Sequence, residues 1–149
     1  MKYVSLLLNV LAGLILTRFT VSKFAAWPIS VAAFEDMAKP LGIDPTMFRI
    51  GTGFIIGFAA LSFFINAALI LWKKSAHDRG LLVFLTGNLY ALGAMTGALF
   101  SEFFLRSVTK WPLVYIAVAI MVISVLNLLP HLGKLPSLLK RNRLIKAAA

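Results

Sequence analysis

The stretch that decides the fold of this sequence is IGTGFIIGFAALSFFINAALILW, residues Ile50–Trp72, which contains no charged side chain. About 20 mostly apolar residues in a helix are enough to cross roughly 30 Å of bilayer hydrocarbon. Asp44 and Pro45 precede the stretch. Asp accepts hydrogen bonds from the free N–H groups of a helix start, and Pro suits the first helical position because it lacks an N–H. The sequence therefore predicts a transmembrane helix that begins near Pro45.

Three further segments are apolar and long enough to span a membrane, at residues 3–22, 81–105 and 111–129. A signal peptide is the alternative for the first segment, because Lys2 precedes an apolar run. No clean small-x-small cleavage site follows it, which favours a retained helix. We predict an all-α membrane protein, a four-transmembrane-helix bundle forming a single domain.

Composition supports this fold class. Hydrophobic residues make up 60% of the chain and charged residues only 13%, against roughly 25% charged in average soluble domains. The chain has no cysteine, which excludes disulfides, thiolate metal sites and thiol redox chemistry. The net charge is +10, but the basic residues flank the apolar runs. They therefore indicate membrane topology and contact with anionic lipid, and argue against nucleic-acid binding.

The basic residues also predict an orientation. Four spans place both termini on one side, together with the loop around Lys73 and Lys74 and the basic tail 130–149. That side carries more basic residues than the other, so the positive-inside rule predicts cytoplasmic termini and a multi-pass protein of a bacterial inner membrane. The tail is interpreted either as a helix on an anionic lipid surface or as topology charges alone.

The segment between the first two spans is too long for a plain connector. Pro28 is placed to open a short helix on which Phe34, Met37 and Leu41 share a face at helical spacing. We predict a short amphipathic outer helix that caps the bundle; a loop lying in the headgroups is the alternative.

Small residues recur in the second and third spans. Helices in lipid associate through close backbone approach, which small residues allow. The sequence predicts packing of this kind inside the bundle, with a homodimer seam as the alternative. The glycines concerned are Gly53, Gly57, Gly87, Gly93 and Gly97.

Two embedded charges are the best candidates for function. Arg18 and Glu102 have opposite signs and lie near the predicted outer ends of their spans. A charge within a span is costly and usually faces protein or water, so we predict that the two form a pair in an outer-leaflet pocket beneath the cap. The alternative is that each reaches the outer headgroups separately.

Polar residues elsewhere do not indicate catalysis. His77 and His131 lack a second ligand at useful spacing, and no phosphate loop, zinc-protease helix or Ser/His/acid set is present. The sequence predicts neither a metal site nor an enzyme. Four asparagines within or near the spans are expected to bond across helices, namely Asn9, Asn66, Asn88 and Asn127.

The order of features over residues 6–71 resembles the DoxX-like four-helix membrane proteins, a group that includes chaperone-type relatives in animals. The first span ends in Val21-Ser22-Lys23-Phe24, an outer segment follows, and a glycine-rich second span begins near Phe48-Arg49. In that group a lysine typically closes the first helix, so the resemblance adds Lys23 to the candidate pocket. This chain departs from the group in lacking a glutamate early in the second span.

The resemblance implies an accessory role, because members are linked to membrane redox complexes or to assembly of other membrane proteins. We therefore expect a non-catalytic accessory, scaffold or assembly subunit, in contact with lipid and with another membrane protein or a second copy of itself. The alternatives are a subunit of a quinone-linked redox complex, and a lipid or small-molecule binder. Both would use the pocket near Arg18 and Glu102.

Overall fold

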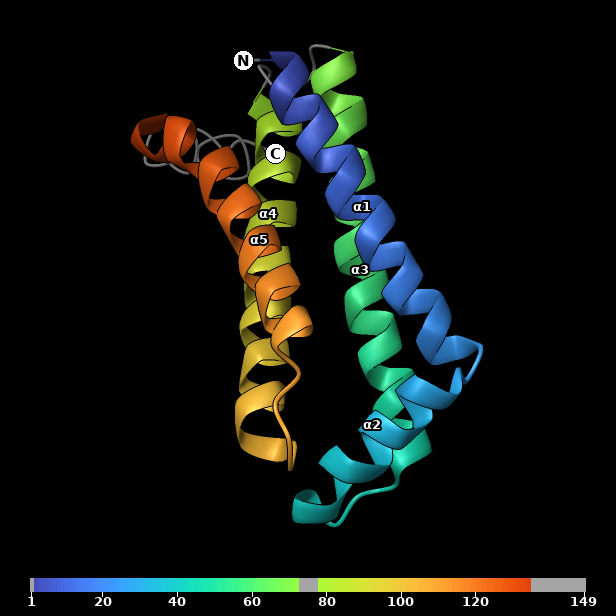
Figure 1. Cartoon of the computed structure of the whole chain (residues 1–149). Helices are drawn as coiled ribbons and strands as arrows, with labels where there is room; N and C mark the ends of the chain where they lie inside the picture. Colours follow the sequence, from blue (N-terminus) through green and yellow to red (C-terminus); the bar gives the residue numbers. More distant parts are fainter. Residues whose placement is uncertain (1, 73–77, 135–149) are drawn as a thin grey trace, which may run out of the picture.

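The computed structural model describes residues 2–72 and 78–134, and all regular structure in these residues is helical (Figure 1). In chain order the elements are α1 (Lys2–Phe24), α2 (Pro28–Ala38), a 3-10 turn (Lys39–Leu41), α3 (Pro45–Leu71), α4 (Asp78–Phe100), a π-helical turn (Ser101–Leu105), α5 (Trp111–Leu128) and a 3-10 turn (Leu129–Lys134). The predicted tail segment 135–149 and the loop containing Lys73, Lys74 and His77 lie outside the described residues.

The prediction of a four-transmembrane-helix bundle is confirmed. Four helical segments are long and apolar enough to cross a membrane: Lys2–Phe24, Pro45–Leu71, Arg79–Leu105 and Trp111–His131. The second has 27 residues, about 40 Å at 1.5 Å per residue. This exceeds roughly 30 Å of hydrocarbon, so α3 must tilt or project from the bilayer.

The helix starts follow the sequence signals. Asp44 caps α3, with its Oδ1 accepting a hydrogen bond of 2.7 Å from the Met47 N–H, and Pro45 occupies the first turn. Pro28 likewise opens the predicted short helix α2. Phe34 and Met37 of α2 are buried as expected.

Leu41 departs from the expected face of the capping helix, with 45% of its surface exposed. Its position was predicted from an uninterrupted α-helical repeat. The chain instead tightens into the 3-10 turn Lys39–Leu41 after Ala38, and the shorter repeat rotates Leu41 off the buried face.

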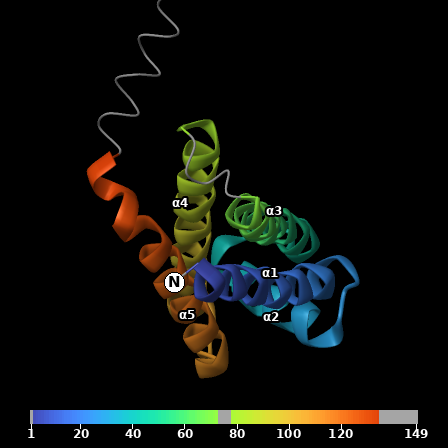
Figure 2. The same cartoon turned by 90° about the horizontal axis from the view of Figure 1, so that it is seen from above.

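The four long helices form two pairs, α1 with α3 and α4 with α5 (Figure 1). The pairs converge at the end that holds the N-terminus and diverge toward α2, which crosses the wider end and contacts α3 and the π-helical turn. Seen from above, α1 and α3 run beside each other at an angle to α4 (Figure 2). The bundle is therefore closed at one end and splayed at the other.

Several glycines lie at close contacts between helices. A Cβ atom at Gly57 would lie 3.2 Å from Thr20 of α1, and one at Gly87 would lie 3.2 Å from Ser62 of α3. Gly53 similarly faces the Phe24 ring at 3.2 Å. At these separations an added side chain would force its neighbour to shift by a few tenths of an ångström. Small residues permit this close approach of helices in lipid.

Asparagines link helices at the converging end. The Asn127 side chain of α5 donates to Asn88 Oδ1 at 2.9 Å and to Asn9 Oδ1 at 3.3 Å, and its own Oδ1 accepts from Ser5 Oγ at 3.0 Å. The expected bonding across helices therefore joins α1, α4 and α5. Asn66 of α3 is buried, but within the described residues its amide has no hydrogen-bond partner.

Candidate functional site

A cavity of about 830 Å³ lies between the two helix pairs at the end crossed by α2. All five α-helices and the π-helical turn contribute to its wall, which is mostly apolar; the lining includes Leu16, Phe19, Phe34, Ile56, Met95 and Ala117. Its volume lies in the range of roughly 300–1,000 Å³ typical of small-molecule sites. The cavity is therefore large enough for a ligand.

Exposed residues of the lining show where the cavity reaches the surface. On the side between α3 and α4, Ile55 and Tyr90 are 48% and 39% exposed, and Gly93 and Gly97 are also exposed. The Tyr90 hydroxyl donates to the Ile55 carbonyl at 3.1 Å, bridging the two helices. With the bundle in a bilayer, this opening faces the lipid chains.

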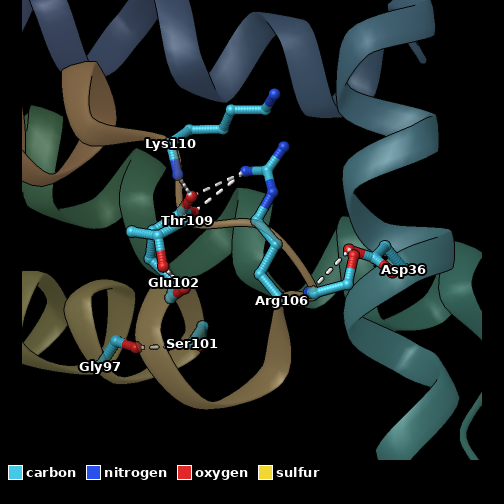
Figure 3. Close-up of polar contacts among 8 residues, drawn as sticks. Asp36, Gly97, Ser101, Glu102, Arg106, Thr109 and Lys110 are labelled. Atoms are coloured by element: carbon cyan, nitrogen blue, oxygen red, sulfur yellow. Dashed lines mark hydrogen bonds and ion pairs between the residues drawn. The ribbon is translucent and has the colours of Figure 1, made fainter.

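Glu102 sits in the π-helical turn at the end of α4, and its carboxylate is fully engaged (Figure 3). Its two oxygens accept from one guanidinium nitrogen of Arg106 at 3.1 and 3.0 Å, and Oε1 also accepts from the Lys110 backbone N–H at 2.6 Å. The side chains of this ion pair are only 8% and 9% exposed. A buried charge needs such a partner, because solvent does not screen it.

The predicted Arg18–Glu102 pair is wrong. Glu102 binds Arg106, and the Arg18 side chain is exposed and makes no contact with it. The buried face of α1 includes Leu16, and two further residues rotate a helix by about 200°. Arg18 therefore points away from the bundle, and it is absent from the lining of the cavity.

Lys23, in contrast, lies in the cavity wall with Glu102. The residue is only 8% exposed, and its Nζ lies 5.7 Å from the Phe19 ring centroid and 5.6 Å from that of Phe34. Its carbonyl accepts a hydrogen bond from the buried Arg49 guanidinium, which ties the end of α1 to α3. The last turn of α1 is thereby held in place with its ammonium group between two aromatic rings.

A contact outside the spans joins α2 to the loop after the π-helical turn. Asp36 Oδ2 accepts from the Ser107 hydroxyl at 2.7 Å and from the Ser107 N–H at 3.0 Å (Figure 3). These bonds favour the ionised carboxylate and hold the pKa of Asp36 below its ordinary value of 3.8. The contact connects the two segments that bound the cavity at this end.

The expected packing role of Gly93 and Gly97 needs correction. Both line the cavity, and a Cβ atom at either position would meet no atom within 4 Å. Gly53, Gly57 and Gly87 do lie at close contacts. The difference arises because α3 and α4 diverge beyond Tyr90, so the same small-residue pattern borders empty space there.

Sequence reasoning missed Arg106 as the partner of Glu102, although the two are four residues apart and this spacing favours an ion pair on a helix. It also missed Ser30, which lines the cavity and whose buried hydroxyl has no hydrogen-bond partner among residues 2–72 and 78–134. No local signal marks Ser30, since only the tertiary fold buries it.

No family model, curated protein or solved structure matches the chain. The site is therefore interpreted from its own geometry. Its polar groups are gathered at one end and its walls are otherwise apolar, an arrangement suited to binding an amphipathic molecule. In the described part of the chain, no three histidine, aspartate or glutamate side chains lie close enough together to hold a metal ion.

Proposed function

We propose that this protein is a non-catalytic membrane protein that holds an amphipathic small molecule in the cavity between its helix pairs. The observation that carries the proposal is the cavity itself, about 830 Å³ with an apolar wall and a charged end. Ligand sites are typically apolar clefts in which a few polar groups fix orientation. The opening between α3 and α4 would let such a molecule arrive from the bilayer.

The accessory or assembly role expected from the DoxX-like resemblance is part of this proposal. A bound lipid-like molecule would be presented to a partner membrane protein, and the opening between α3 and α4 would face that partner or the lipid. We also propose a bacterial inner-membrane location with cytoplasmic termini. The excess of basic residues on the side of the termini is the support for this orientation.

A substitution that fills the cavity without disturbing the helix contacts tests this proposal. Gly97→Leu places a large side chain where a Cβ atom meets nothing within 4 Å. We expect it to abolish binding of a long-chain hydrophobic probe to the protein in phosphatidylcholine nanodiscs, with the thermal midpoint little changed. Ala119→Leu is the matched control, because Ala119 is exposed on α5 outside the cavity lining. Equal binding by the wild type and both variants would reject the cavity as the binding site.

A further inference from the structure

The charges on the cavity wall are unbalanced. Three basic residues, Lys23, Arg106 and Lys110, line the cavity, together with one acidic residue, Glu102. The Glu102 carboxylate is already bound by the Arg106 guanidinium and the Lys110 N–H. Lys110 is exposed, so Lys23 is the buried basic residue of the wall that Glu102 does not neutralise.

Among the three basic residues of the cavity wall, Lys23 is the one whose burial most needs an anion. It is more than nine-tenths buried and, within the described residues, no carboxylate forms an ion pair with its ammonium group. The rings of Phe19 and Phe34 give it two cation–π contacts. Such contacts stabilise a cation but leave its net charge in place, and a buried uncompensated charge is strongly destabilising.

A second polar group on the wall also lacks a partner. The Ser30 hydroxyl of α2 is buried without a hydrogen bond to any described residue. Buried hydroxyls are normally hydrogen-bonded. The Lys23 ammonium can only donate and the Ser30 hydroxyl can donate or accept, so an acceptor group on a ligand would suit both.

The geometry points to a carboxylate as the head group of the ligand, and we propose that the cavity binds a single-chain fatty-acid-like molecule with its carboxylate at Lys23. The inference rests on the function proposed above and names its ligand class. The apolar chain lies along the wall formed by Gly93 and Gly97, toward the opening between α3 and α4. An anionic head supplies the charge complementarity that a neutral apolar ligand cannot.

The size of the cavity favours one chain. Its volume of about 830 Å³ is that of a site for one drug-sized molecule. Gly93 and Gly97 leave open space beside α4, where an unbranched chain would displace no side chain.

The experiment compares palmitate with methyl palmitate, which has the same chain and no charge, on the protein in phosphatidylcholine nanodiscs. We expect palmitate to bind about tenfold more tightly than the ester, as one charge-assisted hydrogen bond allows. Lys23→Met keeps the apolar stem and removes the charge, so it should fold and bind both probes equally. Lys39→Met is the matched control, because the Lys39 side chain is 76% exposed and its loss should leave the preference intact.

Each outcome decides the inference. A preference for palmitate that Lys23→Met abolishes supports it. Equal binding of acid and ester by the wild type overturns the carboxylate assignment, and the proposed function survives if Gly97→Leu still blocks both probes. Failure of the wild type to bind either probe overturns both. If Lys23→Met does not fold, Ser30→Ala must reduce the preference for palmitate several-fold, and an unchanged preference rejects the head-group site.

Discussion

The two ends of the bundle use the same residue types for opposite purposes. At the closed end, Gly87 of α4 meets Ser62 of α3 so closely that a Cβ atom would lie 3.2 Å away. Less than two helical turns further along α4, Gly93 borders a cavity and meets nothing within 4 Å. The presence of a glycine in a membrane helix therefore does not by itself show that another helix packs against that position. Its role depends on whether a neighbouring helix is close enough to use the missing side chain.

The two ends also differ in the kind of polar side chain that each one buries. Asn127 joins Asn9 and Asn88 at the closed end through neutral hydrogen bonds between amides. The splayed end holds the buried charges, including Glu102 with Arg106 and the unbalanced Lys23. These neutral bonds leave no net charge at the closed end, whereas the splayed end retains net charge beside empty space. The closed end is built for stability, and we infer that the splayed end is built for a ligand.

The largest expected effect is at the charged end. Glu102→Ala leaves the Arg106 guanidinium buried without its anion, at a cost of about 3–5 kcal/mol in unfolding free energy. Adding Arg106→Ala should restore much of that loss, whereas Arg18→Ala should combine with Glu102→Ala additively. Unfolding in detergent by denaturant titration measures all the variants. Coupling of Glu102 to Arg18 instead of Arg106 would contradict the structure.

A smaller effect separates the two kinds of glycine. Gly87→Leu forces a side chain against Ser62 and should lower the unfolding free energy by about 1–3 kcal/mol. Gly93→Leu extends into the cavity and should cost much less, so it serves as the matched control on the same helix. The thermal midpoints of the two variants test this difference. Equal destabilisation would mean that α3 and α4 approach each other equally at both positions.

The smallest expected effect concerns the exposed contact between α2 and the loop at Ser107. The depressed pKa of Asp36 means that this contact is fully present above pH 3.8 and is lost as the pH falls below that value, through the folded-state pKa. The protection factor of the Ser107 amide, which corrects for the pH dependence of intrinsic exchange, should therefore fall in acid. Asp36→Asn should weaken this dependence while leaving exchange in the four long helices unchanged. Protection of Ser107 that does not respond to pH would show that Asp36 does not hold the loop.

Local signals were sufficient wherever one helix decided the outcome. The apolar run after Asp44 predicted α3, and the cap and proline chemistry predicted where it begins. Pro28 predicted the start of α2 in the same way. These features depend on free N–H groups and apolar length, which neighbouring residues supply without any contribution from the rest of the fold.

The direction in which a side chain points from its helix was harder to predict. The sequence indicated how far along its helix Arg18 lies, but not that the side chain is on the outer face of α1. In water an apolar stripe identifies the inward face of a helix, but lipid is as apolar as the protein interior and removes that contrast. The position of a residue along its helix could therefore be predicted, whereas the direction in which its side chain faces could not. The Arg18–Glu102 hypothesis was wrong because the Arg18 side chain lies on the outer face of α1.

The sequence alone determined an all-helical chain with four spans, a capped α3, a short helix α2 and an excess of basic residues, because each follows from local composition and the cost of unpaired groups in lipid. The tertiary structure decided which helices pair, that Glu102 binds Arg106, and that Lys23 and Ser30 share a cavity wall with Gly93 and Gly97. Those features depend on the angle between the two helix pairs. That angle depends on many side-chain contacts across all four spans, so the sequence of one segment does not determine it.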